Sequence, residues 1–588
     1  MNISFESFFV VGSVLIPNMI LMLSVFIISK YMFPDVNNVC HTFIAGLTLG
    51  VVICFLYPPL LYSKIEAISV ILYLSISLLA LIIVILKKKT YDLVKVNKFQ
   101  AFLWLSLTAN IIFVHYYDAF KSISPSDIDS LTNYQWINYN LTLPDLGYFP
   151  GVTIISNISY LIVDPIYNLN YFSVSVSLII LLSINLILIN ILSSASLFIF
   201  NLILVSPIYY PLLYTRLGLN NGVLFSLFFY AIITIFIKYK YFLKFNIINL
   251  TIILITLFAA ALTAPHMLLL ISPPIIYSYW VVRHQVSSKM LILILFFGAA
   301  LTLGISFDLK IPTYWKYLIS SPSPSLSNSF PRLLGELISV KSPIRPIFES
   351  YLSLFAYIFL IIILIGLVYA LKYKLIKYQI ILGFCFFLNI TNLTGIFEFS
   401  YLKGRSGWYL MYAVALLACI VFDDLIKHFH SFKQVKYLNT LLLIGVLSSL
   451  FFSILVPPKP YRFQNEDGLI YIKNIVEKNQ SSSINLKTDL LHANLIDSRI
   501  LVNKFSNTEL WQYDYILLNM QSNIPDLFLA NLRRYEDRNF QKFISDQKND
   551  TRLRLEFNQN IVDNATKFGK FTYLESNSNF ILLKRTYL

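Results

Sequence analysis

The chain has 588 residues, of which 57% are hydrophobic and only 13% charged, and its mean hydropathy is +0.69. Soluble globular proteins carry about twice that charged fraction, so the composition excludes a soluble enzyme and predicts a polytopic membrane protein. The formal net charge of +15 is accounted for by basic loops at a membrane face and a mixed-charge tail. It therefore does not indicate nucleic acid as a partner.

Apolar windows long enough to cross a hydrocarbon layer of about 30 Å recur along the chain up to residue 455. They predict an α-helical membrane domain over residues 1–456 with about fourteen transmembrane helices. The expected ranges are 8–28, 42–61, 66–86, 99–115, 171–192, 196–213, 222–237, 246–263, 267–282, 290–306, 351–371, 379–397, 406–426 and 437–456.

The basic residues predict the orientation. If the N-terminus lies outside the cytoplasm, seventeen Lys and Arg residues fall in the inner connections and ten in the outer connections, which are longer in total. Positive charge concentrates in cytoplasmic loops. The long loops at 116–170 and 307–350 and the tail after residue 456 are therefore expected outside the cytoplasm, in the cytoplasmic membrane of a bacterium or archaeon.

Residues 457–588 differ abruptly in composition from the membrane domain. Pro457-Pro-Lys-Pro460 ends the last apolar run, and a charged, Asn-rich segment follows. Helical periodicity at 468–478 and 525–547, and strand patterns at 513–520 and 571–584, predict a small extracytoplasmic α/β or α+β domain.

The loop at 116–170 carries the first candidate for chemistry, the pair Asp127 and Asp129 in Ser124-Pro-Ser-Asp-Ile-Asp-Ser130. Separated by one residue, the two carboxylates can flank one acceptor hydroxyl or hold one divalent cation, Mg²⁺ or Mn²⁺. The same residues also fit a helix start, with Ser124 as N-cap, Pro125 in the first turn and Asp127 facing the helix dipole.

An amphipathic stretch, Ile128 to Tyr139, follows the acidic pair and contains three interfacial aromatic residues. Lying flat at the membrane surface, it would hold the carboxylates at the depth of a lipid phosphate. Tyr148-Phe-Pro-Gly151 then forms a rigid turn leading back to the membrane.

These features resemble the GT-C membrane glycosyltransferases, in particular the branch with a Tyr-Pro-Pro-Gly-like motif that includes arabinofuranosyl- and mannosyltransferases. The matching positions are Asp127, Asp129, Pro144, Tyr148, Pro150 and Gly151. The resemblance implies a polyprenyl-phosphate sugar donor and a glycan, lipid or protein acceptor outside the cytoplasm. The sequence departs from the pattern in two ways, because its acidic loop follows the fourth predicted helix and Phe149 replaces the first proline.

Such a reaction needs a base for the acceptor hydroxyl, which an Asp provides, and cations for the departing phosphate. Arg405, in Tyr401-Leu-Lys-Gly-Arg405 at the outer mouth of a late helix, is the best phosphate ligand, and Lys403 can assist. His266 and Arg216 lie at other predicted outer turns. Each also has a structural interpretation, as a snorkelling cation or an interfacial histidine.

Two other functions compete with glycosyl transfer. A transporter or flippase for a lipid-linked glycan would place its charges near the bilayer midplane, but the predicted helix centres carry almost none. A polysaccharide polymerase or ligase would depend on basic residues in its large outer loop, such as Arg332 and Arg345, more than on an acidic pair.

Overall fold

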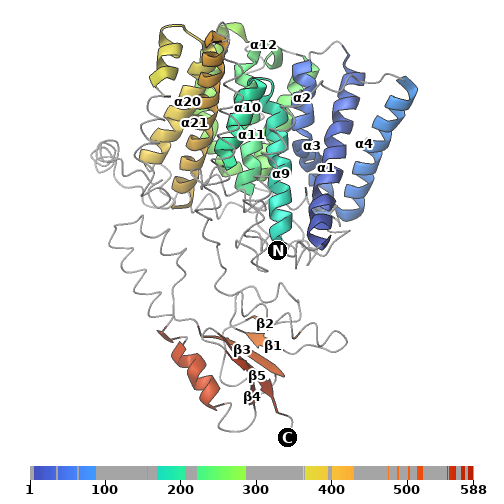
Figure 1. The fold of residues 1–588 in the computed structure, drawn as a ribbon, viewed down its shortest axis with the longest axis vertical. Coiled ribbons are helices and arrows are strands. Elements are labelled where there is room, and N and C mark those ends of the chain that lie inside the picture. The colour runs from blue at the N-terminus through green and yellow to red at the C-terminus, as the bar shows by residue number, and fades with distance from the viewer. Residues whose placement is uncertain are drawn as a thin grey trace. The chain divides into compact units, whose positions relative to one another are not determined.

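The structure is a computed structural model of the chain. It describes most residues of 5–34, 38–62, 65–87, 169–205, 221–244, 246–286, 364–394 and 400–429, together with 486–488, 501–502, 513–520, 555–564, 571–576 and 580–586, and a few isolated positions. The described residues form two compact units, one within residues 1–458, which is helical, and one within residues 459–588 (Figure 1).

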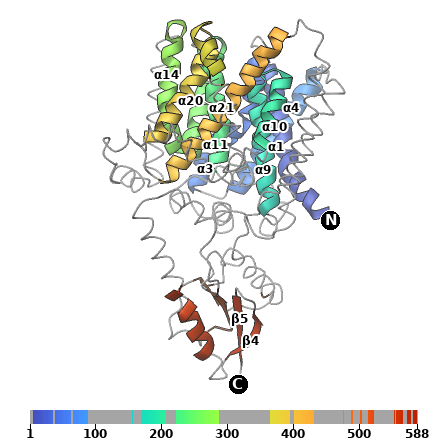
Figure 2. The same ribbon diagram turned by 60° about the vertical axis from the view of Figure 1, so that its left-hand side comes forward.

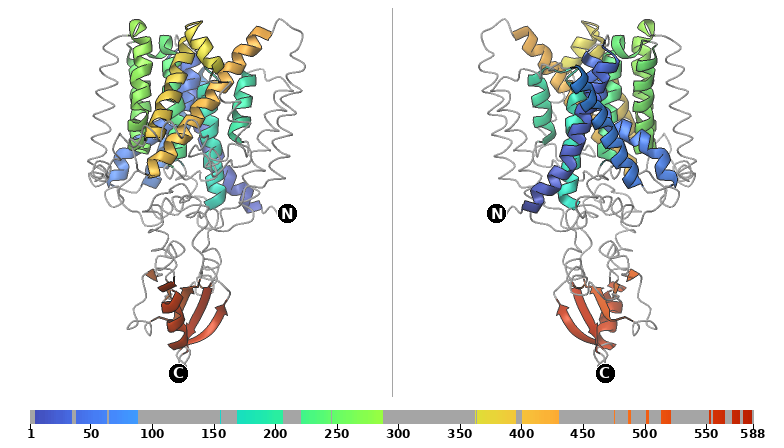
Figure 3. Two further views of the ribbon diagram at one scale, coloured as in Figure 1. Left: turned by 90° about the vertical axis from the view of Figure 1, so that its left-hand side faces the viewer. Right: turned by 90° about the vertical axis from the view of Figure 1, so that its right-hand side faces the viewer.

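The N-terminal helices of the helical unit have the composition of membrane spans. Helices α1 (Phe5–Met32) and α4 (Ile65–Lys87) pack side by side (Figure 3), and α1 also packs against α9 (Leu169–Leu188). Both α1 and α4 expose rows of large apolar side chains, including Leu23 and Leu74. Exposed rows of this kind suit contact with lipid rather than with water.

Among the described residues, α1 and α4 are the two helices long and apolar enough to cross a membrane individually. Most of the other expected spans in the described part of the chain also coincide with helices, whereas 99–115, 290–306 and 437–456 lie outside the described residues. The helical character of these segments is confirmed, and the total of about fourteen spans stays a prediction.

The single span expected over 42–61 is instead a bent pair of helices. Helices α2 (Asn38–Gly46) and α3 (Thr48–Tyr62) meet at Leu47, and their directions differ by 51°. Thr48 Oγ1 donates a hydrogen bond of 2.7 Å to the carbonyl oxygen of Ala45, next to the bend. This bond satisfies a backbone group that would be costly to leave unpaired inside a membrane.

A close helix crossing explains why the bend occurs at this position. A Cβ atom added to Gly46 would lie 2.7 Å from Cγ1 of Ile187 and 2.8 Å from the carbonyl oxygen of Ser183, both in α9. Glycine therefore lets the end of α2 approach the backbone of α9, as small residues do at helix crossings in membranes. The continuous apolar sequence gives no sign of this tertiary contact.

The second half of the helical unit is built around a completely buried helix. Its helices are α10 (Ser194–Val205), α11 (Asn221–Ile237), α13 (Ile247–Thr263), α14 (Pro265–Val282), α20 (Ile376–Thr394) and α21 (Ser400–Phe429) (Figure 2). Every side chain from 223 to 236 in α11 is buried, and α11 packs against α9, α13, α14, α20 and α21. A helix that is apolar on all sides is expected at the centre of a bundle.

A reciprocal amide pair joins α9 to α10. Asn185 Nδ2 donates to Asn201 Oδ1 at 3.0 Å, and Asn201 Nδ2 donates to Asn185 Oδ1 at 2.9 Å. Asn201 is fully buried and also donates to the carbonyl oxygen of Leu197. The pair fixes the register of the two helices, because a slide of one turn would leave both amides without these partners.

The C-terminal unit contains a mixed five-stranded sheet with the order β2-β1-β3-β5-β4. Its strands are β1 (Leu486–Thr488), β2 (Leu501–Val502), β3 (Tyr515–Asn519), β4 (Phe571–Ser576) and β5 (Phe580–Arg585). Strand β1 runs parallel to β2 and β3, whereas β5 runs antiparallel to β3 and β4. The strands expected within 513–520 and 571–584 are confirmed.

A helix over residues 555–564 covers one face of this sheet. Ile561 and Val562 pack with Ile516, Leu518 and Leu583 in the core of the unit. The sequence pattern did not predict this helix, because polar residues separate its few apolar positions. The helix expected over 525–547 lies outside the described residues.

Candidate functional site

The two ends of the helical unit differ in chemistry, and α21 defines them. We call the end at which α21 begins the Arg405 end and the end at which it finishes the Asp423 end. Helices α11 and α14 also begin at the Arg405 end, and α13 and α20 finish there, because α13 runs back from α11 and α20 runs opposite to α21 (Figures 1 and 2).

Helix α21 begins earlier than the expected span, and this places two predicted site residues within it. The apolar run predicted a start near residue 406, but α21 begins at Ser400, so Lys403 and Arg405 have helical backbone. Residues 405, 409 and 412 lie on one helix face, since residues three and four apart are neighbours on a helix. Lys403, two residues from Arg405, lies on a different face.

The helix face that carries Tyr409 and Tyr412 is turned towards α11. The ring centroid of Tyr409 lies 5.4 Å from the ring centroid of Phe225 and 5.3 Å from that of Phe229, both in α11. Tyr230 Oη donates a 3.2 Å hydrogen bond to the carbonyl oxygen of Tyr412. Position 405 precedes Tyr409 by one helical turn, which is about 6 Å along the axis. Since α11 begins one turn before Phe225, position 405 lies near the first turn of α11.

His266 is the second residue of α14, directly after a one-residue connection from α13. The backbone N–H of Ala264 still donates to Ala260 in α13, at 3.0 Å, and Pro265 begins the next helix. Proline suits a first helical position because its missing N–H would have no partner there. His266 therefore lies at a turn between two helices, at the Arg405 end.

The remaining predicted site residues, Asp127, Asp129, Tyr148 and Arg216, lie outside the described residues. Arg216 precedes the first residue of α11 by five positions in the sequence. The described residues contain no group of three His, Cys, Asp or Glu side chains that could hold a metal ion, and the proposed cation site at Asp127 and Asp129 is not among them.

At the Asp423 end, a buried carboxylate joins α21 to the start of α10. Asp423 Oδ1 accepts hydrogen bonds from the backbone N–H of Ser193 at 3.1 Å and from Ser196 Oγ at 3.0 Å. Ser193 is the residue before α10, and its own Oγ accepts from the N–H of Ser196. The negative charge of Asp423 thus faces the N-terminus of α10, where the helix dipole favours it.

The neighbouring carboxylate joins α21 to α20. Lys377 Nζ lies 2.6 Å from each oxygen of Asp424, and Tyr378 Oη donates to Asp424 Oδ2 at 2.8 Å. Tyr369 stacks on Tyr378 with ring centroids 5.0 Å apart. Asp423 and Asp424 therefore tie three helices together at the end opposite Arg405.

The sequence analysis did not single out Asp423 and Asp424, which we call the acidic clasp, although the sequence contains a signal for them. Two adjacent aspartates follow an apolar run of about fifteen residues in α21, and carboxylates at such a place are costly unless they are paired. Their partners Ser193 and Lys377 lie far away in the sequence, so only the packing of the helices identifies them.

The sequence matches no family model and no curated protein. Among solved structures, it is similar to an archaeal oligosaccharyltransferase, AglB from Archaeoglobus fulgidus, in complex with an inhibitory peptide and a dolichol-phosphate. The similarity covers 75% of this chain and 71% of that chain, with 9% identity and a TM-score of 0.40. At this level the similarity assigns neither a fold nor an activity.

Proposed function

We propose that this protein is a membrane glycosyltransferase of the GT-C type, which transfers a sugar from a polyprenyl-phosphate donor to a glycan, lipid or protein acceptor. The observation that carries the proposal is the position of Arg405. It lies at the start of α21, on the helix face turned to α11, at the same end of the helical unit as His266. A cation there can meet a lipid-linked phosphate at the membrane surface.

The chemistry assigned to this end follows from the residue types. One of Asp127 and Asp129 takes the proton of the acceptor hydroxyl as its oxygen attacks the anomeric carbon of the sugar. The bond from that carbon to the phosphate oxygen breaks, and the departing phosphate keeps the electron pair. Arg405 stabilises that charge, and Lys403, His266, Tyr148 and Arg216 contribute to donor binding. The two carboxylates can also hold Mg²⁺ or Mn²⁺.

The distribution of charge in the described helices favours this function over transport. Their charged residues lie within about two turns of the helix ends, and the most deeply buried one, Asp423, is paired at the Asp423 end. A transporter would be expected to keep ionisable groups near the middle of interrupted helices.

The orientation proposed here puts the Arg405 end outside the cytoplasm. All the Lys and Arg residues with described side chains in the helical unit lie at the other end, among them Lys30, Lys240, Arg283 and Lys377. The positive-inside rule places that end in the cytoplasm. The C-terminal unit, assigned to residues 457–588, then lies outside and supports acceptor binding.

The test measures transfer of a labelled sugar from a polyprenyl-phosphate donor by purified single variants. Asp127→Asn or Asp129→Asn keeps the shape of the side chain but removes its basicity, so the base variant should lose about 10²- to 10⁴-fold in turnover with donor affinity nearly unchanged. Asp145→Asn in the same loop is the matched control. Full activity in both variants would show that neither aspartate is the base and would favour the interpretation of Asp127 as part of a helix start.

Arg405 is tested by donor affinity rather than by turnover. Arg405→Ala should weaken donor binding because the phosphate loses charge-assisted hydrogen bonds. Lys403→Ala should have a smaller effect, because Lys403 lies on a different face of α21. Equal effects of the two changes would indicate general attraction of the donor and contradict a specific phosphate contact at Arg405.

A further inference from the structure

A basic elbow connects α11 to α13 at the Asp423 end. It consists of residues 238–247 and contains α12 (Tyr239–Phe242). Lys240 and Lys244 are exposed, and between and beside them Tyr241 and Ile247 expose 42% and 76% of their surface. The elbow thus presents cations and apolar groups together.

A buried amide holds the backbone of this elbow in place. Asn249 Nδ2 donates to the carbonyl oxygens of Tyr241 at 2.8 Å and of Lys244 at 3.0 Å. Asn246 Oδ1 caps α13 by accepting from the N–H of Asn249 at 2.7 Å. Because these bonds satisfy the backbone from inside, the exposed side chains of the elbow are free to face a partner outside the protein.

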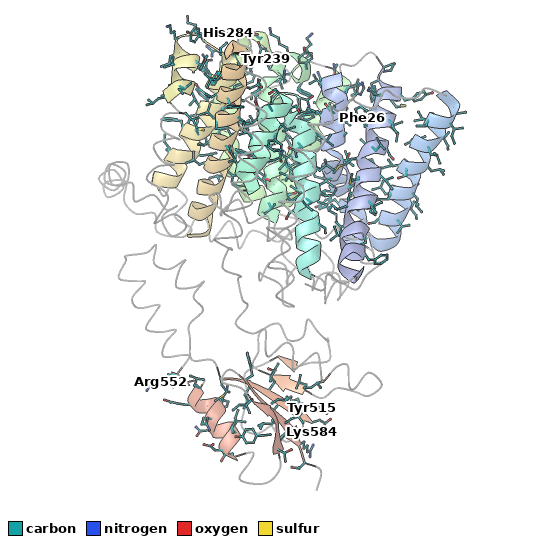
Figure 4. All side chains as sticks on the ribbon, in the orientation of Figure 1. Phe26, Tyr239, His284, Tyr515, Arg552 and Lys584 are labelled. Carbon is teal, nitrogen blue, oxygen red and sulfur yellow. The ribbon has the colours of Figure 1, made fainter. Side chains whose placement is uncertain are left out.

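The turn after α14 adds a third cation next to the elbow. Tyr239 Oη donates a hydrogen bond to Gln285 Oε1, which joins the elbow to the short helix η3 (Arg283–Gln285). The Arg283 guanidinium lies 4.3 Å from the ring centroid of Trp280, and its Nη1 donates to the Trp280 carbonyl oxygen at 2.6 Å. Tyr239 and His284 lie at the same end of the helical unit (Figure 4).

The charges of Lys240, Lys244 and Arg283 are not compensated by a carboxylate within the described part of the chain. The described carboxylates at this end, Asp423 and Asp424, bind Ser193, Ser196, Lys377 and Tyr378. Among the described residues, no carboxylate forms an ion pair with Lys240, Lys244 or Arg283. An anionic partner therefore fits the surface.

The apolar side chains determine the kind of anion. Trp280 exposes 57% of its surface, and Tyr241 and Ile247 are exposed beside the lysines. Aromatic residues with adjacent cations are typical of the headgroup layer, where rings meet acyl chains and cations meet phosphates. A free phosphate would use the cations but gain nothing from these apolar groups.

We propose that the basic elbow and η3 bind the headgroup of an anionic phospholipid. Lys240, Lys244 and Arg283 contact its phosphate, while Tyr241, Ile247 and Trp280 lie among the upper parts of the acyl chains. The proposal requires that the helical unit lies in a membrane, and it does not depend on the reaction catalysed at the other end.

The experiment measures phosphatidylglycerol binding to the full-length protein in neutral detergent by native mass spectrometry. A cation near an anionic surface contributes about 1 kcal/mol, which is about fivefold in affinity. The variant Lys240→Gln/Lys244→Gln should therefore lose about 25-fold. The charge-matched control is Lys372→Gln/Lys374→Gln in the turn before α20, which should lose less than threefold.

Three results would overturn the proposal. Equal losses in the two double variants would show that only the overall charge of this end matters. No loss in either would show that the lysines of the elbow do not bind the lipid. Inorganic phosphate that stabilises the protein as well as phosphatidylglycerol, at equal concentration, would show a simple anion site. Trp280→Ala separates these cases, because it should weaken lipid binding and leave any binding of phosphate unchanged.

Discussion

Lys377 and Asp424 form an ion pair between α20 and α21, with Nζ 2.6 Å from both carboxylate oxygens. The lysine side chain is 30% exposed and the aspartate side chain 13% exposed, so the pair lies at the border of the buried region. Asp423, the next residue, bonds to the start of α10. One helical turn of α21 thus connects two neighbouring helices at the end opposite Arg405.

Removing one partner of this ion pair should cost more than removing both. Lys377→Met removes the cation from Asp424, which keeps its hydrogen bond from Tyr378. It should destabilise the protein by about 1–2 kcal/mol, less than for a fully buried pair because solvent screens the lysine. Lys377→Met/Asp424→Leu should recover part of the loss. Thermal unfolding of the purified variants measures this, and strictly additive losses would contradict an energetic coupling.

Gly46→Ala should destabilise the helical unit by about 1–3 kcal/mol, the usual cost of overpacking. The new methyl group would meet the backbone of α9 at Ser183 and the side chain of Ile187. Gly12→Ala in α1 is the matched control, since its nearest neighbour would be Ile16 Cδ1 at 3.6 Å, an ordinary contact. Thermal unfolding should separate the two variants, and equal melting temperatures would argue against the close crossing of α2 and α9.

The amide pair between α9 and α10 should show a measurable coupling. Hydrogen bonds between helices in membranes contribute about 0.6 kcal/mol on average and up to about 1.7. The two reciprocal bonds of Asn185 and Asn201 should therefore give a coupling of about 1–2 kcal/mol. A double-mutant cycle with Leu at each position, followed by thermal unfolding, would give no coupling if the two amides did not meet.

The orientation can be tested with single cysteines in a variant lacking the four native ones. Asn564→Cys, exposed in the C-terminal unit, should react with a membrane-impermeant maleimide in intact cells. Lys244→Cys, at the Asp423 end, should react only after permeabilisation. The reverse pattern would place the Arg405 end in the cytoplasm and remove the proposed active site from the outer surface.

The parts of this fold that the sequence predicts are those dominated by local patterns. The span expected over 222–237 coincides with α11 almost residue for residue, because a continuous apolar run between polar ends has few other solutions in a membrane. Strands β3, β4 and β5 were predicted for a similar reason, from local strand patterns at 513–520 and 571–584.

The features that escaped prediction depend on contacts between distant segments. The bend at Leu47 follows from the approach of Gly46 to α9, and the clasp at Asp423 follows from a serine 230 residues earlier in the chain. Within the candidate site, the position of Arg405 on a helix face required the true start of α21. The acidic pair at Asp127 and Asp129 stays a prediction from sequence.

The strand order of the C-terminal sheet has a consequence for biosynthesis. Strand β5 (Phe580–Arg585) lies between β3 and β4 rather than at an edge. Until β5 has been synthesised and has left the ribosome, β3 and β4 both lack the strand that pairs with them, and one edge of β3 stays unpaired. A premature stop codon before residue 580 would therefore delete an interior strand and expose both neighbours to pairing with other chains. The quality-control proteases that recognise such unpaired edges would be expected to remove the truncated product.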